Sequence, residues 1–312
     1  MWGTHYSSRL NSLQDFCRQS IVRYDEREKI AWLYMNPSPR PCITPVLLED
    51  VRRSQHVWAE VNREAFLNGD EQPVQYTVLA SAYPGIYSYG GDLSLFIQFI
   101  KERDAEGLRQ YAYMCIDDVY LMAINLHQPV TTIALVQGDA LGGGFEAALS
   151  CNYIVAEKGA QFGFPEILFN LFPGMGAYSF LSRKIGMVQA EKMITSGKTY
   201  TAEEMFEMGV VDFLVEKGRG EDGVYEFVRN HRKKRNAHLS LVRVRQRVNP
   251  VTREELIDVA DMWVETAMKI GERELKIMER LVRAQDRLRT DSTEKVHPLR
   301  RGEKEQPEIR IT

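Results

Sequence analysis

Short apolar runs, rich in β-branched and aromatic residues, recur along the first two thirds of the chain. Most of them stop at Pro, Gly or Asn, residues that interrupt a sheet ladder or form turns. The run 130–136 consists almost wholly of apolar and β-branched residues, which is typical of a strand buried on both faces. Strands are predicted at 29–35, 74–80, 130–136, 153–156 and 161–164.

Helical periodicity fills the segments between these runs and most of the chain after residue 215. Helices are expected at 45–66, at 145–150 and in a long stretch whose apolar face carries Tyr111, Cys115, Val119, Met122 and Leu126. Two later helix starts, at Thr201 and Thr252, show the Thr-x-x-Glu pattern of a capping box. The second of these helices has an apolar stripe formed by Leu256, Val259, Trp263, Ala267 and Ile270.

Strands alternate with helices up to about residue 215, and helices alone follow. This order predicts an α/β core with a C-terminal helical extension. We expect four parts: an N-terminal extension at 1–28, a core that holds the active site at 29–220, a helical region at 221–289 and a polar tail at 290–312.

The charge and cysteine content exclude several classes of partner and cofactor. With 40 Lys+Arg against 43 Asp+Glu, the net charge of -3 gives no global attraction for nucleic acid or an anionic membrane. The four cysteines form no C-x-x-C pair and the six histidines show no ligand spacing, so no disulfide framework and no metal are expected. Neither a signal peptide nor a membrane span is indicated, and we expect a cytoplasmic protein.

The strongest chemical signal is the segment Q-G-D-A-L-G-G-G-F-E, from Gln137 to Glu146. A buried strand ends in three glycines, and a helix begins with an acid in its first turn. Glycines let a ligand approach the backbone, and the free N–H groups of a helix start favour negative charge, including a developing oxyanion. The same features also serve helix-against-strand packing, so this segment alone leaves both interpretations open.

A second acid, Glu166, is the only charged residue between Gln161 and Arg183. A carboxylate among so many apolar neighbours must accept hydrogen bonds or have a raised pKa. A buried Glu satisfied by loop amides is the structural alternative. Two carboxylates in different apolar settings can hold one proton between them for general acid/base work. The pair Glu146 and Glu166 therefore favours catalysis.

The runs A-L-G-G-G-x-E (140–146) and Q-F-G-x-P-E followed by P-G (161–174) resemble the signature of the enoyl-CoA hydratase/isomerase (crotonase) superfamily. The resemblance covers residues 29–215 and implies a crotonase-type ββα spiral with Glu146 and Glu166 as the catalytic pair. It implies an oxyanion hole made by the amides of Gly143 and Gly91, the latter in a Gly-Gly-Asp turn. Substrate contacts are implied for Gly90, Leu141, Gly142, Gly174, Met175 and Trp263.

Within the superfamily the sequence is most similar to the diffusible signal factor synthases, which make cis-2-unsaturated fatty acids for bacterial quorum sensing. The likeness lies in M-N-P-S-P-R-P (35–41), Y-G-G-D-L-S-L-F (89–96), G-D-A-L-G-G-G-F-E-A-A-L-S (138–150) and F-P-G-M-G-A-Y (172–178). It implies dehydration of a 3-hydroxyacyl group on acyl carrier protein, followed by thioester hydrolysis.

The resemblance also implies a homotrimer in which residues 221–289 serve oligomerisation and line the pocket. It implies no cofactor beyond the phosphopantetheine that bears the acyl group, on acyl carrier protein or in CoA. Two alternatives stay open at this point: an ordinary enoyl-CoA hydratase acting on CoA thioesters, and a regulatory protein that binds a sensor histidine kinase.

Three other motifs receive less weight. Ser88 lies in a G-x-x-S-x-G segment rather than the G-x-S-x-G elbow of hydrolases, so a turn serine is expected. The segment from Gly174 to Gly176 lacks the third glycine of a dinucleotide loop. Cys151 is expected to be a small core residue rather than a nucleophile.

One strongly basic run extends from Arg229 to Arg235 and is followed by Arg243, Arg245 and Arg247. The default interpretation is a solvated helix face. The functional interpretation is a docking patch for an acidic carrier protein or for its phosphopantetheine phosphate. Nucleic acid is disfavoured because no aromatic residues are interleaved with the charges.

Overall fold

The computed structural model describes residues 3–292, so residues 293–312 of the expected tail lie outside the described residues. Within the described part the chain forms two sheets. The larger sheet has the order β1-β2-β3-β5-β7-β10, with β1 (Ser20–Asp25), β2 (Ile30–Met35), β3 (Tyr76–Ser81), β5 (Thr131–Val136), β7 (Tyr153–Glu157) and β10 (Phe213–Val215). The smaller sheet has the order β4-β6-β8-β9, with β4 (Ile86–Ser88), β6 (Asp139–Leu141), β8 (Gln161–Gly163) and β9 (Thr199–Thr201).

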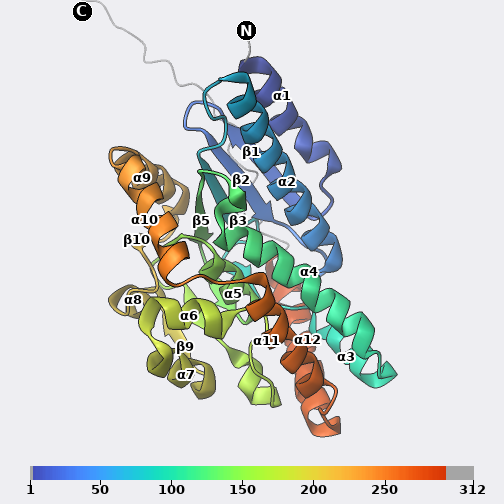
Figure 1. Cartoon of the computed structure of the whole chain (residues 1–312). Helices are drawn as coiled ribbons and strands as arrows, with labels where there is room; N and C mark the ends of the chain where they lie inside the picture. The colour runs from blue at the N-terminus through green and yellow to red at the C-terminus, as the bar shows by residue number, and fades with distance from the viewer. Residues whose placement is uncertain (1–2, 293–312) are drawn as a thin grey trace, which may run out of the picture.

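The helices surround these sheets (Figure 1). They are α1 (Gly3–Ser12), α2 (Pro45–Asn68), α3 (Leu93–Glu102), α4 (Ala105–Ala123), α5 (Gly143–Ser150), α6 (Ala177–Ile185), α7 (Met187–Ser196), α8 (Ala202–Glu207), α9 (Gly220–Arg232), α10 (Arg235–Val248), α11 (Arg253–Ala267) and α12 (Glu272–Ser292). Short 3-10 helices are η1 (Leu13–Phe16), η2 (Asn125–His127) and η3 (Pro165–Phe169).

The two sheets are built by one repeated unit. A strand of the larger sheet is followed by a strand of the smaller sheet and then by helix, as in β3-β4-α3, β5-β6-α5 and β7-β8-η3. Strands β2, β3, β5, β7 and β10 run parallel, and so do β4, β6 and β8. This arrangement, with helices alone after β10, confirms the expected ββα spiral with a C-terminal helical extension.

The larger sheet is covered on both faces, which explains why its strands are apolar throughout. Strand β2 is buried at every residue. Ile30, Trp32 and Tyr34 belong to the apolar cluster beneath α9, whereas Leu33 and Met35 belong to the main core on the side of α2. Figure 1 shows α2 and α9 on opposite sides of these strands. A side-chain period of two therefore divides one strand between two cores.

The N-terminal residues contribute to the larger sheet. β1 pairs antiparallel with β2 over its whole length, from Ser20 opposite Met35 to Asp25 opposite Ile30. The domain boundary expected at residue 28 stays a prediction, but the strand just before it extends the sheet. Its partly exposed sequence lacks the apolar run that revealed the other strands, so pattern alone did not predict it.

Two expected helix features differ in detail. α4 ends at Ala123, and Leu126 lies in η2 with a positive φ of 54°, although its side chain is still buried with the predicted face. The box at Thr201 is complete, because the carboxylate of Glu204 accepts the N–H of Thr201. At Thr252 only half of the box forms, since the carboxylate of Glu255 pairs with Arg183 instead.

We expect Asp50→Ala to lower the free energy of unfolding by about 3 kcal/mol, because its carboxylate accepts two amides that would lose a charged partner. Asp50 on α2 is 1% exposed, and its Oδ2 accepts the N–H groups of Arg18 at 2.8 Å and Gln19 at 2.6 Å just before β1. Urea unfolding followed by circular dichroism measures the change. Glu49→Ala, which removes only an exposed ion pair on the same helix, should cost less than about 1 kcal/mol. Equal losses in the two variants would contradict this assignment.

Candidate active site

Three neighbouring parallel strands of the smaller sheet end at the same edge. Ser88 of β4 lies opposite Ala140 of β6, and Leu141 of β6 lies opposite Gly163 of β8. The carboxyl ends of parallel strands meet at one edge, where ligand sites of α/β folds commonly form. The chain leaves these three ends towards Gly91, Gly143 and Glu166, and the register therefore brings the predicted site segments together.

Two glycines allow the backbones to approach closely at this edge. Gly90 has a φ of 84°, and a Cβ there would lie 2.8 Å from the amide nitrogen of Gly143. Gly142 has a φ of 52°, and a Cβ there would collide with Oε1 of Glu166. Only glycine adopts such conformations without strain and also leaves room for the neighbouring groups. The Gly-rich segments are therefore required by the site and not by helix packing alone.

The amides of Gly91 and Gly143 lie side by side. Gly143 is the first residue of α5, so its N–H has no intrahelical acceptor. A Cβ placed on Gly143 would lie 3.4 Å from the amide nitrogen of Gly91. Neither amide donates to another loop or turn within residues 3–292. The N–H group at the start of α5 and the neighbouring N–H group of the Gly91 turn are together suited to an anionic oxygen.

Glu146, in the first turn of α5, is fixed by backbone donors. Its Oε1 accepts the N–H groups of Met175 at 2.7 Å and Ala177 at 2.9 Å, the latter at the start of α6. The residue is 2% exposed, and this burial raises the pKa of its carboxyl group to about 7 although the two amides oppose the shift. Glu146 therefore has one defined orientation and exchanges its proton near neutral pH.

Glu166, in η3, has a different environment. Part of the residue faces solvent, yet its Oε2 is buried and has no hydrogen-bond partner in the described chain. Burial, and secondarily the negative charge of Glu146, raise the pKa of its carboxyl group to about 8. Glu166 lacks the two amide donors that favour the ionised form of Glu146. A buried polar atom without a protein partner is the exception in native structures, and here it belongs to a residue that lines a cavity.

Both carboxyl groups line a cavity of about 140 Å³. Eight predicted residues form part of its wall: Gly91, Leu141, Gly143, Glu146, Glu166, Gly174, Met175 and Trp263. Gly90 and Gly142 lie behind this wall and do not line it. Gly174 packs against the indole of Trp263, where no Cβ would fit. Their roles in substrate binding stay predictions.

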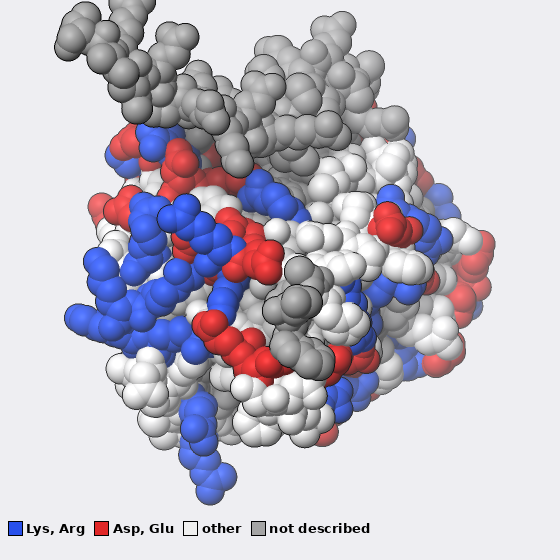
Figure 2. Space-filling view, turned by 90° about the horizontal axis from the view of Figure 1, so that it is seen from above, with Lys and Arg blue, Asp and Glu red and all other residues white. Residues whose placement is uncertain are grey.

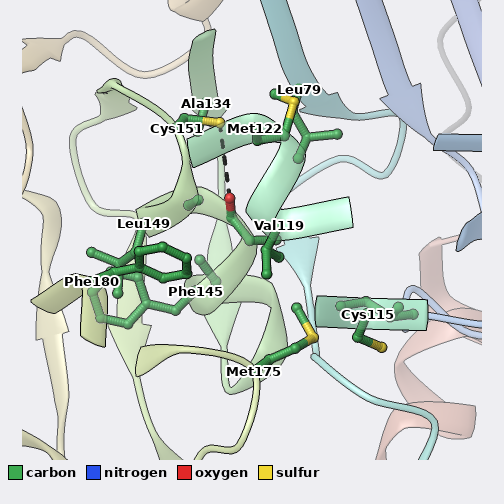
Figure 3. Packing of buried hydrophobic residues seen from close by; sticks show 14 of the residues in the cluster. Leu79, Cys115, Val119, Met122, Ala134, Phe145, Leu149, Cys151, Met175 and Phe180 are labelled. Atoms are coloured by element: carbon green, nitrogen blue, oxygen red, sulfur yellow. Dashed lines mark hydrogen bonds between the residues drawn. The ribbon is translucent and has the colours of Figure 1, made fainter. Parts of the chain in front are cut away.

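Several wall residues were not predicted from the sequence. Tyr111, Ala112 and Cys115 of α4 line the cavity, together with Phe96 of α3 and Leu281 and Gln285 of α12. Figure 3 shows Cys115 and Met175 close to one another, with Val119 and Met122 above them in this view. The apolar face of α4 was visible in the sequence, but its pattern is the same for a core and for a pocket wall. Nothing in the sequence near α12 indicates that this helix lies close to Glu146 and Glu166.

The candidates given less weight have structural roles. The hydroxyl of Ser88 accepts the N–H of Gly90 at 3.1 Å, as a turn serine does. Burial raises the pKa of the Cys151 thiol to about 12, so it is not a thiolate nucleophile. Within the described residues no group of three His, Cys, Asp or Glu side chains is arranged to hold a metal ion.

None of the helices within residues 3–292 is both long and apolar enough to cross a bilayer.

The chain is similar in sequence to several proteins of known function. The chain is 31% identical over 156 residues to the peroxisomal fatty acid beta-oxidation multifunctional protein AIM1 of Arabidopsis thaliana, a match covering 50% of this chain and 21% of that protein. It is 27% identical over 192 residues to a crotonyl-CoA hydratase of Syntrophomonas wolfei, covering 62% of this chain and 68% of that enzyme. The chain thus spans about a fifth of the length of the first relative.

The fold is shared with solved structures. A crystal structure of an enoyl-CoA hydratase/isomerase from Xanthobacter autotrophicus Py2 superposes with a TM-score of 0.67 at 17% identity, covering 88% of this chain and 97% of that one. At this identity the likeness shows the fold alone. The sequence profile of the enoyl-CoA hydratase/isomerase family matches residues 54–284, and the chain therefore belongs to that family.

Proposed function

We propose that the protein interconverts 2-enoyl and 3-hydroxyacyl thioesters, with Glu146 and Glu166 as its acid/base pair. The proposal rests on one observation: two carboxyl groups with raised pKa values face a mainly apolar cavity beside two adjacent backbone amides. Its support from relatives favours CoA as the acyl carrier, because the similar Syntrophomonas wolfei protein is a crotonyl-CoA hydratase.

The environments of the two acids assign their roles in hydration. The amides on Oε1 of Glu146 stabilise its ionised form, so it is the base that takes a proton from water as the water oxygen bonds to C3. Burial and the nearby charge of Glu146 raise the pKa of Glu166, so its protonated form gives a proton to C2. The amides of Gly91 and Gly143 hold the thioester oxygen as negative charge develops on it. Dehydration runs the same steps in reverse.

A second candidate function is synthesis of a cis-2-unsaturated fatty acid signal from a 3-hydroxyacyl group on acyl carrier protein. In this reaction dehydration is followed by attack of water on the same thioester carbonyl, which releases the free acid and the carrier thiol. The resemblance of segments 35–41 and 172–178 to signal synthases supports it, as does the exposed basic surface of α9 and α10. Figure 2 shows Lys and Arg side chains gathered on one side of the molecule.

The structure narrows which residues of the basic run are available to a partner. Arg232 pairs with Glu28 at 2.8 Å, and Arg235 donates to Gln72 at 2.9 Å, so both hold the fold together. The exposed cluster is Arg229, Lys233, Lys234, Arg243, Arg245 and Arg247. α9 and α10 lie on the other side of the molecule from α3 and α12 (Figure 1). No residue of α9 or α10 lines the cavity, which further favours CoA over a docked carrier protein.

Assembly and regulation are also matters of proposal. A homotrimer follows from the family, and α10 carries exposed Leu241, Val244 and Val248 at helical spacing, which a neighbouring subunit would cover. Binding of a sensor histidine kinase is the least supported role. Two buried carboxyl groups cost stability, and a protein that only binds a partner has no use for them.

We expect Glu146→Gln and Glu166→Gln each to lower turnover of crotonyl-CoA by about 100-fold or more, because each removes a proton-transfer group. Loss of absorbance of the conjugated thioester measures hydration, and circular dichroism verifies folding. Glu226→Gln, at an exposed position of α9, should leave the rate unchanged. Activity near that of the wild type in either folded site variant would refute the assignment.

The same carboxyl groups should make stability fall with rising pH. Their pKa values are about 7 and 8 in the folded protein against an ordinary value of 4.5, so the folded state binds more protons between these limits. Stability therefore decreases as pH rises through this window. Glu166→Gln should raise the melting temperature by a few degrees at about pH 9 and have little effect at about pH 4. A thermal shift that is the same at both pH values would contradict the raised pKa.

Whether the acyl group is carried by acyl carrier protein or by CoA can be tested separately from the roles of the two glutamates. If the cluster docks acyl carrier protein, as the second candidate function requires, reversing Lys233 and Lys234 to Glu should lower kcat/KM about tenfold for a substrate on that carrier. A CoA thioester should be unaffected, because rim charges act on association. Reversal of Arg53 and Arg63, exposed on α2, is the matched control. Unchanged kcat/KM on the carrier-bound substrate would mean that the cluster is only a solvated surface and not a docking site.

A further inference from the structure

Arg40, in the segment M-N-P-S-P-R-P, does not line the cavity but is only 8% exposed. Its Nη2 donates to Oδ1 of Asp92 at 3.0 Å and to the hydroxyl of Ser94 at 2.8 Å, at the start of α3. Its Nη1 donates to Oδ1 of Asp286 on α12 at 3.1 Å. Burying a guanidinium group is costly unless it is paired and hydrogen-bonded. The single side chain therefore joins two helices through specific contacts.

One of these contacts adjoins the candidate oxyanion hole. Asp92 directly follows Gly91 and caps α3 by accepting the N–H of Ser94 at 3.0 Å. Its oxygen Oδ1 accepts both this N–H and Arg40. The position of the Gly91 amide is thus limited on its C-terminal side by a residue that Arg40 holds.

The chain around Arg40 also supports the turn through its backbone. The carbonyl of Pro41 accepts the N–H of Tyr89 at 2.8 Å, and the N–H of Ile43 donates to the carbonyl of Gly90 at 2.7 Å. Ile43 forms an isolated parallel bridge with Gly91. One short segment therefore holds both the backbone and the cap of the oxyanion turn.

The other contact of Arg40 is with α12, which lines one side of the cavity and is called its roof below. Leu281 and Gln285 of α12 line the cavity, and Asp286 is the next residue. A second link between the two helices, Lys101 of α3 to Glu279 of α12 at 2.8 Å, is more exposed, with 55% of the Lys101 side chain accessible. Figure 1 shows α12 beside α3.

We propose that Arg40 is a positioning residue that couples the α12 roof to the Gly91 amide. The inference rests on the proposed function. An acyl chain long enough to contact Leu281 stabilises the position of α12, and Arg40 transmits this to the oxyanion turn. Binding energy from the distal part of the substrate then appears in kcat and not only in KM. The proposal requires that a short acyl group leaves Leu281 uncontacted and so does not use the coupling.

The test compares kcat and KM for crotonyl-CoA and 2-dodecenoyl-CoA. Asp286→Asn weakens the α12 contact of Arg40 and leaves its contacts with Asp92 and Ser94 in place. We expect kcat to fall about tenfold for the long substrate and less than about twofold for the short one. Arg40→Met removes both contacts and should lower kcat about tenfold or more for both substrates. Arg40→Lys should not restore the rate, because an ammonium group cannot reproduce the fork of donors. Lys101→Met is the matched control between the same helices and should change neither rate.

Hydrogen exchange of the amides in 272–292 supplies a readout that does not depend on turnover. It should be faster in Asp286→Asn and Arg40→Met and unchanged in Lys101→Met. Unchanged exchange in Asp286→Asn, or an equal loss of kcat on both substrates in that variant, would overturn the coupling. If the wild type turned over neither thioester, the proposed function would fail, while the exchange data would still decide whether Arg40 holds α12. Asp286 is half-exposed, so its variant remains informative if Arg40→Met does not fold.

Discussion

The parallel register of β4, β6 and β8 is the constraint on which the site depends. These strands have only three residues each, and they place the turn at Gly90, the start of α5 and the start of η3 at one sheet edge. Each of them follows a strand of the larger sheet after a short connection, so the larger sheet limits where the smaller one can form. A shift of one residue in this register would separate the amide of Gly143 from that of Gly91 and turn Glu166 away.

The surrounding fold compensates for part of the desolvation cost of burying the two acids. Glu146 is buried on a helix that is itself buried at every residue, and two backbone amides offset part of the desolvation. Glu166 has no such compensation at its Oε2. The two acids therefore differ in their affinity for a proton although they share one cavity, and this difference is what acid/base chemistry near neutral pH requires.

The cavity itself is an assembly of distant segments. α3 and α4 supply one wall, the loop at Gly174 and Met175 another, and α11 and α12 close it from the C-terminal third. Arg40 lies in none of these walls but contacts two of the helices that form them. The shape of the cavity thus depends on how these helices are held together as well as on the two glutamates.

The sequence alone determined the strands of the spiral with strong apolar runs, the starts of the main helices and the two acids in apolar, glycine-rich settings. These features are local. A β-branched run, a capping residue or an isolated carboxylate can be recognised from a segment of about ten residues. The resemblance then implied which amides and substrate contacts to expect. Tertiary structure alone decided that β1 completes the sheet, that Glu255 pairs with Arg183 rather than with its own helix start, and that Leu281 reaches the cavity. Such contacts join residues that are far apart in the chain. No local pattern specifies them, because the partner of each side chain is determined by how the helices pack against one another.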